Sequence, residues 1–336
     1  MLDIDQNIEK IRQNFLKEYL EEIIHPVLPN QFWEGISSSG PVSNPNTIFI
    51  PRLSSKNCFF KNSNYYFQGN TKFIHYTSLN NLLNILNEGY IRLHDFNFFD
   101  DPQEFLVVAQ RLGLKSFRDD YKDLRALIFA ISMCKYDDIT NPDKFEMWRM
   151  YGNDGVGVGL VFSFINNLEN WENFHLSNVY YEKDKLEVFS QLNKKHIDLI
   201  QKYPISIHHN SLDREGRKLP IEVSILAGFH KNYIYKIEDE VRLIAYSPHM
   251  NMGKTDFEIF RTINKSNNPS TYIKLPLSIN TKNNPAIPQI KIDKIIIGYR
   301  YNQEDFIQIQ GLLRQIAVYK YELAFDVEFS ELKNYF

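Results

Sequence analysis

The sequence FIHYTSLNNLLNILNEGYIRLHDFNFFDDPQEF, residues 73–105, contains both the clearest structural pattern of the chain and its densest set of reactive side chains. Leucine and isoleucine recur at helical spacing from residue 79 to residue 86. Thr77 or Ser78 can accept the first free amides of such a helix, and Gly89 stands where a left-handed C-cap is needed. The stretch therefore predicts a strand, a helix, a turn and a second strand, with His75 at the end of the first strand.

Length and composition exclude several classes of protein. The 336 residues are enough to bury a full core, and the net charge of -3 gives no whole-chain attraction to nucleic acid or anionic membrane. Cys58 and Cys134 are the only cysteines, and they form neither a disulfide framework nor a zinc motif. We find no signal peptide and no apolar run long enough to span a membrane. We expect a cytoplasmic protein that does not associate with a membrane.

The first 70 residues differ from the rest in pattern. Apolar residues from Ile8 to Ile23 recur on one face of a helix that should run from Asp5 to about Ile24. The text from Pro29 to Asn70 is rich in turn residues and predicts loops with a short strand near residues 48–50. We therefore expect a helical and loop extension over residues 1–70 and an α+β domain over residues 71–336. The helix either docks on its own domain, which is the commoner case, or mediates self-association.

The middle of the chain predicts a buried strand followed by a short helix. Residues 125–133 are apolar over a strand length, and Asp143 can cap a helix from Lys144 to Tyr151. The glycines of GNDGVGVG precede a strand and no Lys-Ser/Thr follows, so they indicate a turn with close backbone packing and not a phosphate loop. Further expected elements are helices at 186–203, 220–235 and 303–316, and strands at 158–164, 272–277, 294–298 and 318–323.

Two carboxylates and a guanidinium lie close together late in the chain. In KIEDEVRLIAY the alternation of a strand places Glu238, Glu240 and Arg242 on one face, with Val241 and Leu243 on the other.

These motifs together resemble a bacterial domain-of-unknown-function family, number 2971. The resemblance lies in His75-Tyr76-Thr77 before a helix that ends in Gly89, Asp101-Pro102 with Glu104, Met147-Trp148 with Tyr151, the Glu-x-Glu-x-Arg strand and IIIGY near the C-terminus. It extends from about Lys72 to Leu323.

The order of these elements is also similar to the core of ADP-ribosyltransferases, which implies a split, mixed β-sheet with flanking helices. By this resemblance His75 would bind a ribose hydroxyl of NAD, the Tyr76 backbone would hold the carboxamide, Tyr151 would stack on nicotinamide, and Glu240 would act beside the scissile bond. Tyr136, Tyr180 and Tyr181 are alternatives for the stacking residue, and Tyr76 replaces a common glycine. Other substrate contacts expected in this way are Thr77, Ser132, Trp148, Glu238, Arg242, Asp101 and Glu104.

The residue types suit this chemistry. Cleavage between ribose and nicotinamide passes through an oxocarbenium-like state, which a nearby carboxylate stabilises. A second carboxylate can orient the acceptor or raise the pKa of its partner. NAD would be the substrate, the acceptor a protein, a nucleic acid or water, and no metal would be needed. Analogy with such enzymes suggests a toxin or a phage-defence effector.

Other interpretations remain open. Each residue also fits a structural role: His75 as an interior histidine, Glu240 in an ion pair, and Trp148 with Tyr151 as core aromatics. A metal-dependent phosphodiesterase or nuclease would use His94, Asp95, Asp100, Asp101 and Glu104. A third possibility is a non-catalytic module that binds a nucleotide.

Overall fold

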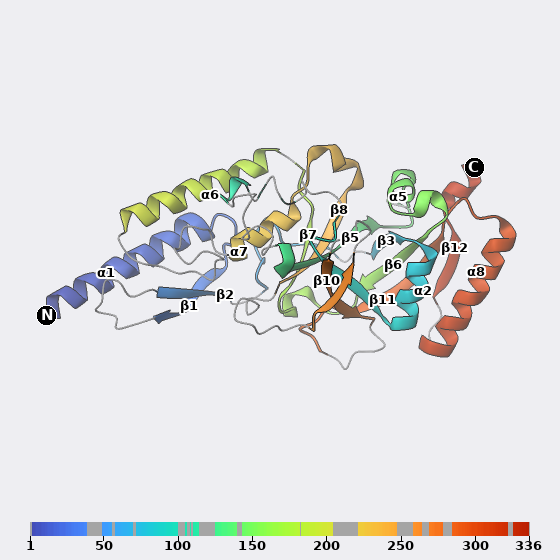
Figure 1. Ribbon diagram of the computed structural model, residues 1–336, viewed down its shortest axis with the longest axis horizontal. Helices are drawn as coiled ribbons and strands as arrows, with labels where there is room; N and C mark the ends of the chain where they lie inside the picture. Colours follow the sequence, from blue (N-terminus) through green and yellow to red (C-terminus); the bar gives the residue numbers. More distant parts are fainter. Residues whose placement is uncertain are drawn as a thin grey trace.

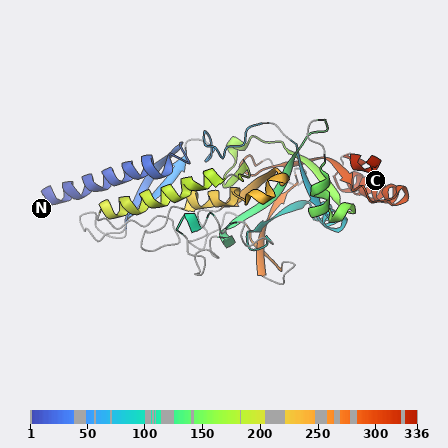
Figure 2. The same cartoon turned by 90° about the horizontal axis from the view of Figure 1, so that it is seen from above.

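The protein is elongated, with long helices at one end and a large β-sheet in the rest of the molecule (Figures 1 and 2). The computed structural model describes residues 2–38, 49–55, 58–69, 72–99, 105, 108, 110–113, 125–139, 143–181, 183–203, 221–246, 258–263, 269–277, 284–321 and 325–335. Helices α1 (Leu2–Tyr19) and α6 (Lys183–Lys202) lie at one end, and α8 (Gln303–Ile316) lies near the C-terminus at the other.

Helices and strands are interspersed along the chain, and several strands follow one another directly. The helices are α1 (Leu2–Tyr19), α2 (Leu79–Glu88), α5 (Phe145–Met150), α6 (Lys183–Lys202), α7 (Ile221–Ser224) and α8 (Gln303–Ile316), with π-helical turns η1 (Leu20–Ile24) and η8 (Ala317–Tyr321) and 3-10 turns η2 (Asn153–Gly155), η3 (Leu168–Asn170), η4 (Ile225–Phe229), η5 (Tyr233–Glu238) and η9 (Glu331–Tyr335). The strands are β1 (Gln31–Ser38), β2 (Phe49–Ser55), β3 (Lys72–Thr77), β4 (Tyr90–Asp95), β5 (Ile128–Tyr136), β6 (Val158–Phe164), β7 (Phe174–Asn178), β8 (Glu240–Tyr246), β9 (Phe260–Ile263), β10 (Pro269–Pro276), β11 (Ile290–Ile297) and β12 (Asp326–Phe329).

The large sheet is mixed, and it branches at β5. Ten of the described strands form it, and these neighbours are antiparallel except the β11–β12 pair. One edge of β5 pairs with β8 from Ile128 to Cys134. On the other edge, β3 pairs with residues 134–136 and β4 pairs with residues 129–130. Among the described strands this leaves Ile131–Met133 between the two partners, and we call this stretch the branch point.

Hydrophobic residues fill both faces of the sheet. Alternating positions of β3, β6 and β11 point to opposite sides, as expected for strands. On one side Phe73 and Leu160 join a core that α2 and α8 cover, and on the other side Ile74 and Val161 pack with Trp148 of α5. The mixed α/β architecture with a large mixed sheet agrees with the expected α+β class.

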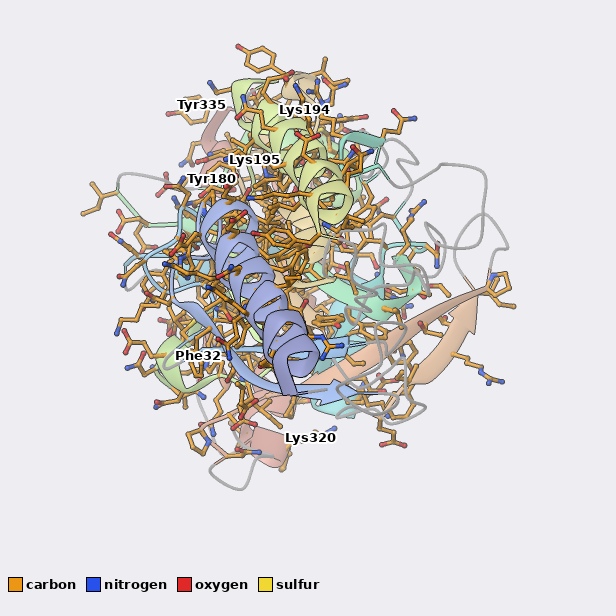
Figure 3. The ribbon with its side chains drawn as sticks, turned by 90° about the vertical axis from the view of Figure 1, so that its left-hand side faces the viewer. Phe32, Tyr180, Lys194, Lys195, Lys320 and Tyr335 are labelled. Carbon is orange, nitrogen blue, oxygen red and sulfur yellow. The ribbon has the colours of Figure 1, made fainter. Side chains whose placement is uncertain are left out.

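The helical end shares one core with residues from much later in the chain. Phe15 and Tyr19 of α1 lie in the same cluster as Phe189 and Leu199 of α6. The Tyr19 hydroxyl lies 2.8 Å from His196 Nδ1. Lys194 and Lys195 are exposed on α6, where Figure 3 views this end of the molecule. The first 70 residues also form a two-stranded sheet, β1–β2, in addition to the expected helix.

Two local patterns act as the sequence predicts. The Ser78 side chain accepts the Asn81 N–H at the start of α2, and Gly89 ends the helix with φ of 78°. The glycine turn after α5 is a close backbone contact, because a Cβ on Gly157 would lie 2.5 Å from the Thr77 carbonyl oxygen. Only glycine allows this approach, so no phosphate-binding role is needed to explain the pattern.

Three expected elements differ in the structure. Asp143 does not cap α5, whose N-cap is Lys144. The helix expected over 220–235 breaks into α7 and η4, with extended backbone at His230. The strand expected at 318–323 is wrong over its described part, because Ala317–Tyr321 is π-helical and the last strand is Asp326–Phe329. No helix among the described residues is long and apolar enough to cross a membrane.

Candidate functional site

His75 lies beside the branch point of the sheet. β3 leaves β5 after the Ile74–Cys134 pair, and the side chain of the next residue, His75, donates from Nδ1 to the Ser132 carbonyl oxygen at 2.9 Å. The imidazole thus bonds a carbonyl at the point where the strand ladder ends. Burial lowers the pKa of His75, and the hydrogen bond to the carbonyl offsets this only in part. His75 is therefore neutral at neutral pH.

Glu238 and Glu240 approach each other by a different route from the one the sequence predicts. Glu238 is the last residue of the 3-10 turn η5, so strand alternation does not place it, whereas Glu240 opens β8. Asp239 between them is left-handed, with φ of 45° and ψ of 49°. Val241 and Leu243 do face the opposite core, as expected. A tight turn, and not a shared strand face, brings the carboxylates together.

Glu240 is held by two cations. Its Oε1 accepts from Arg242 Nε at 2.8 Å, and Arg242 Nη2 lies 2.7 Å from the same oxygen. Its Oε2 lies 3.3 Å from Lys231 Nζ. Burial alone would raise the pKa of Glu240, but Arg242, Lys231 and a hydrogen bond from Ser132 lower it below the ordinary value. Glu240 is therefore an anion at neutral pH.

The pKa of Glu238 is shifted in the opposite direction to that of Glu240. Its Oε1 accepts from the Tyr151 hydroxyl at 2.9 Å and its Oε2 pairs with Lys231 Nζ at 2.7 Å. Burial raises the pKa of Glu238 and outweighs the attraction of Lys231. Two neighbouring carboxylates whose pKa values are pushed in opposite directions form an arrangement that acid–base catalysts use.

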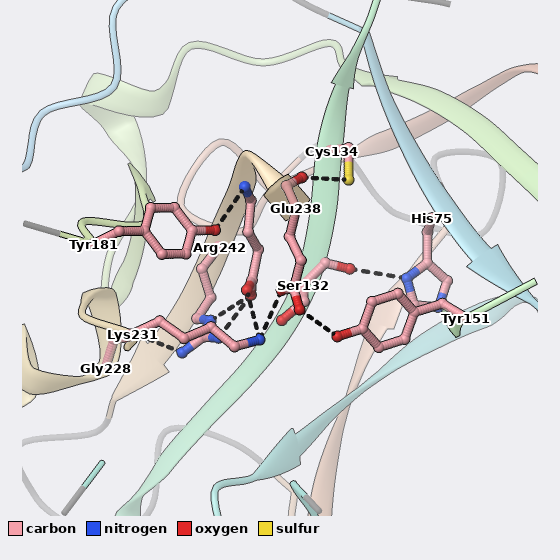
Figure 4. A network of polar contacts seen from close by, with 10 residues as sticks. His75, Ser132, Cys134, Tyr151, Tyr181, Gly228, Lys231, Glu238 and Arg242 are labelled. Atoms are coloured by element: carbon pink, nitrogen blue, oxygen red, sulfur yellow. Dashed lines mark hydrogen bonds and ion pairs between the residues drawn. The ribbon is translucent and has the colours of Figure 1, made fainter. Parts of the chain in front are cut away.

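Ser132 connects the early and late parts of this cluster (Figure 4). Its carbonyl accepts from His75, and its side chain hydrogen-bonds to Glu240. Ser132 also lies opposite Arg242 in the β5–β8 register. The structure therefore joins the expected residues His75, Ser132, Tyr151, Glu238, Glu240 and Arg242 into one polar network, which we call the branch-point cluster.

Tyr151 is the aromatic residue of this cluster with an accessible ring. It is 45% exposed, although its hydroxyl is fixed by Glu238. Tyr181 is buried and its hydroxyl accepts the Glu240 N–H at 3.1 Å. Tyr136 and Tyr180 bond elsewhere, to Asp138 and to the Asn64 carbonyl. Of the four candidates, Tyr151 alone combines an exposed ring with a side-chain contact to the carboxylate pair.

Three expected contact residues lie in the core instead. Trp148 is fully buried and donates from Nε1 to Asp143 at 2.5 Å, so its ring is not available to a ligand. Tyr76 packs edge-on against Trp148, with ring centroids 5.1 Å apart, and its backbone pairs with Gly159. Thr77 is buried and accepts from Asn81 Nδ2. The Trp148 side chain therefore packs in the core, and the side chains of Tyr76 and Thr77 are buried as well. The expected contact through the Tyr76 backbone stays a prediction.

The residues proposed as metal ligands do not form such a site where they are described. The described part of the chain holds no group of three metal-ligating side chains. Asp95 is buried and accepts from Ser270 and from both the backbone and hydroxyl of Thr271. His94 stacks on Phe98, and burial lowers its pKa to about 4. Asp100, Asp101 and Glu104 lie outside the described residues.

Lys231 is the member of the cluster that the sequence does not reveal. It lies seven residues before Glu238, in a stretch expected to be helical. A lysine in such a helix is expected to lie on the surface with its charge in solvent. The helix breaks at His230, and the chain changes direction there. This buries the side chain of Lys231, which is 7% exposed. The available signal was the density of acidic residues in EDE, which requires a cation in a buried setting.

The comparison with protein families agrees with the first resemblance. Residues 147–243 match the model of a family described as a protein of unknown function (DUF2971). This segment contains Tyr151, Lys231, Glu238, Glu240 and Arg242, and it is shorter than the expected range of Lys72 to Leu323. His75 lies outside it. No curated protein and no solved structure matches the chain.

Proposed function

We propose that the protein cleaves the nicotinamide–ribose bond of NAD, as an ADP-ribosyltransferase or an NAD glycohydrolase. One observation carries the proposal: His75 and Glu240, which are far apart in sequence, contact the same residue, Ser132. The branching of the sheet at this point supports an ADP-ribosyltransferase-like fold, in which such residues surround the dinucleotide.

The two carboxylates suit different steps. As the bond from the ribose C1′ to the nicotinamide nitrogen breaks, its electron pair leaves with neutral nicotinamide, and positive charge develops on the ribose. Anionic Glu240 would stabilise that charge. The acceptor then bonds to C1′, and its proton goes to Glu238, whose raised pKa suits a general base. Neither step, written in this way, requires a metal ion.

Tyr151 and His75 would position the substrate. The Tyr151 ring is held by the hydroxyl bond to Glu238, so stacking on nicotinamide would order little further freedom. Neutral His75 uses Nδ1 on Ser132, which fixes the ring so that Nε2 can accept from a ribose hydroxyl. This preorganisation lowers the entropic cost of reaching the reactive geometry.

The test is release of nicotinamide from NAD, followed by chromatography, in the presence of EDTA. Wild-type protein should release nicotinamide, and Glu240→Gln should lower the turnover by about 10²–10³. Glu146→Gln, which alters an exposed glutamate on α5, is the matched control and should keep the wild-type rate. Thermal melting of each variant separates lost chemistry from lost folding.

Other outcomes would identify the competing functions. A Glu240→Gln variant with the wild-type rate would remove Glu240 from the mechanism. A thermal shift with NAD but no nicotinamide release would favour a binding module. Cleavage of a phosphodiester that depends on added Mg²⁺ or Mn²⁺ would favour the nuclease. Either of the last two results would overturn the proposal.

A further inference from the structure

We propose that Lys231 is a positioning residue that holds Glu238 and Glu240 together as an ionised pair ready for substrate. The catalytic consequence rests on the proposed function, whereas the effect on the two carboxylates can be measured without it. Lys231 is not one of the residues that the chemistry of NAD cleavage suggests. The argument for it comes from three features: its fixed backbone, its contacts with both carboxylates, and the charges around Glu238.

The backbone of Lys231 is fixed independently of the carboxylates. Its N–H donates to the Tyr180 carbonyl at 3.0 Å, and Tyr180 donates in turn to Phe229. The preceding residue, His230, forms a parallel bridge with Tyr180, and its Nε2 lies 2.9 Å from the Tyr65 hydroxyl. Residues on both sides thus hold the chain at the point where the side chain begins. The ammonium group therefore has a defined position, whereas the ammonium group of a surface lysine samples many positions.

The ammonium group contacts both acids at once (Figure 4). Its Nζ is 2.7 Å from Glu238 Oε2 and 3.3 Å from Glu240 Oε2. It also lies 4.8 Å from the centroid of the Tyr235 ring, a cation–π distance. A lysine that bridges two carboxylates offsets the repulsion that otherwise forces one of them to stay protonated.

The charges around the pair are unequal. Arg242 forms an ion pair with Glu240. Among the described residues, Lys231 is the cation that pairs with Glu238. The other groups that face Glu238 are the Tyr151 hydroxyl and the Glu240 carboxylate. Tyr181 contacts the Glu240 backbone, and the Cys134 thiol lies 3.3 Å from the Glu238 carbonyl. Lys144 pairs with the intervening Asp239 at 3.5 Å. Glu238 thus depends on Lys231 for ionisation far more than Glu240 does.

The sign of the effect follows from this inequality. Loss of Lys231 removes the cation beside a buried carboxyl group, so Glu238 would keep its proton to higher pH. Under the proposed function a protonated Glu238 cannot accept the proton of the acceptor. The acid limb of the pH–rate profile should therefore move to higher pH in a Lys231→Met variant. Lys231→Arg keeps the charge and should restore most of the wild-type profile.

The experiment is a carbon NMR titration of the full chain labelled at the glutamate side-chain carboxyl carbon, with Glu238 assigned through Glu238→Gln. In Lys231→Met the Glu238 midpoint should rise by about one pH unit or more. In Lys231→Arg it should stay near the wild-type value. Lys236→Met is the matched control, because Lys236 lies on η5 over the Tyr233 ring and not at the carboxylates. The same variants are then assayed for nicotinamide release against pH.

The two proposals fail in distinguishable ways. An unchanged Glu238 midpoint in Lys231→Met overturns the role of Lys231, whatever the activity. Wild-type protein that releases no nicotinamide overturns the proposed function, while the titration still decides on Lys231. Lys231→Gln is a second uncharged variant in case Lys231→Met does not fold. If both uncharged variants fail to fold and Lys231→Arg folds, the required charge is supported; if all three fail, the role assigned to the charge is overturned.

Discussion

Replacement of Arg242 by methionine should destabilise the protein by about 4 kcal/mol at neutral pH. Arg242 is fully buried, where it bonds Glu240 through two nitrogen atoms and donates from Nη1 to the Gly228 carbonyl at 2.6 Å. Removal of one partner of a buried ion pair costs about 3–5 kcal/mol. Lys231 stays near Glu240, so we expect the lost ion pair to cost about 3 kcal/mol. The Gly228 carbonyl, which loses its donor, adds about 1 kcal/mol. Methionine can still pack against the stacked rings of Phe96 and Phe99, whose centroids lie 5.5 and 5.4 Å from Arg242 Cζ.

The measurement is urea unfolding followed by tryptophan fluorescence and circular dichroism. A matched control is Arg300→Met, because the Arg300–Asp154 pair is half exposed and its loss should cost under about 0.5 kcal/mol. The double variant Arg242→Met with Glu240→Gln should recover most of the lost stability, since no buried charge then lacks its partner.

The pH dependence gives a second check of the same reasoning. The lowered pKa of Glu240 means that its stabilising contribution is present above the ordinary pKa, 4.5, and is lost as pH falls through the lowered folded value. The difference between wild type and Arg242→Met should therefore shrink in acid. A single variant within about 0.5 kcal/mol of wild type, or a double variant no more stable than the single one, would refute the assigned ion pair.

Two further predictions concern other parts of the molecule. Burial raises the pKa of Glu222 from 4.5 to about 7, so its neutral form stabilises the fold below the ordinary value and this contribution is lost as pH rises toward 7 and above. Glu222→Gln should therefore match wild type at pH 4.5 and exceed it by about 3 kcal/mol at pH 8, as unfolding at each pH will show; equal stabilities at pH 8 would contradict the burial argument. Gly298→Ala should lose about 2 kcal/mol or more, because its Cβ would lie 2.3 Å from the Gly155 carbonyl oxygen, whereas Gly311→Ala, with open space in α8, should gain about 0.5–1 kcal/mol. Similar melting temperatures for these two alanine variants would show that the close backbone contact does not exist.

Local signals predicted the parts of the fold that depend on local physics. Ser78 and Gly89 bound α2 because capping depends on the residues at each end of the helix. The glycine-rich turn was correctly interpreted from its place before a strand. Asp143 failed as a cap, since its carboxylate is used in the core by Trp148 and Ser330. A tertiary contact replaced the local one, and nothing in the neighbouring sequence shows this.

The candidate site was predictable in its residue types but not in its geometry. Glu240 and Arg242 follow strand alternation, so their proximity could be read from the sequence. Glu238 joins them through a left-handed Asp239, a conformation that sequence spacing does not reveal. Lys231 enters the cluster only because the chain breaks at His230 and bridges to Tyr180. Long-range pairing of this kind sets the burial of a charge, and burial decides whether a lysine is solvated or part of a site.

The core that α1 shares with α6 limits how the first part of the chain can be exchanged or trimmed. Tyr19 and Phe15 are buried against elements that follow residue 180, and Phe15 meets Tyr203 edge-on at 5.5 Å. A chain that began at residue 71 would expose to solvent the apolar face of α6 that α1 covers, and an exposed apolar patch favours aggregation. Any exchange of α1 must therefore be matched by a change in the surface of α6 that packs against it.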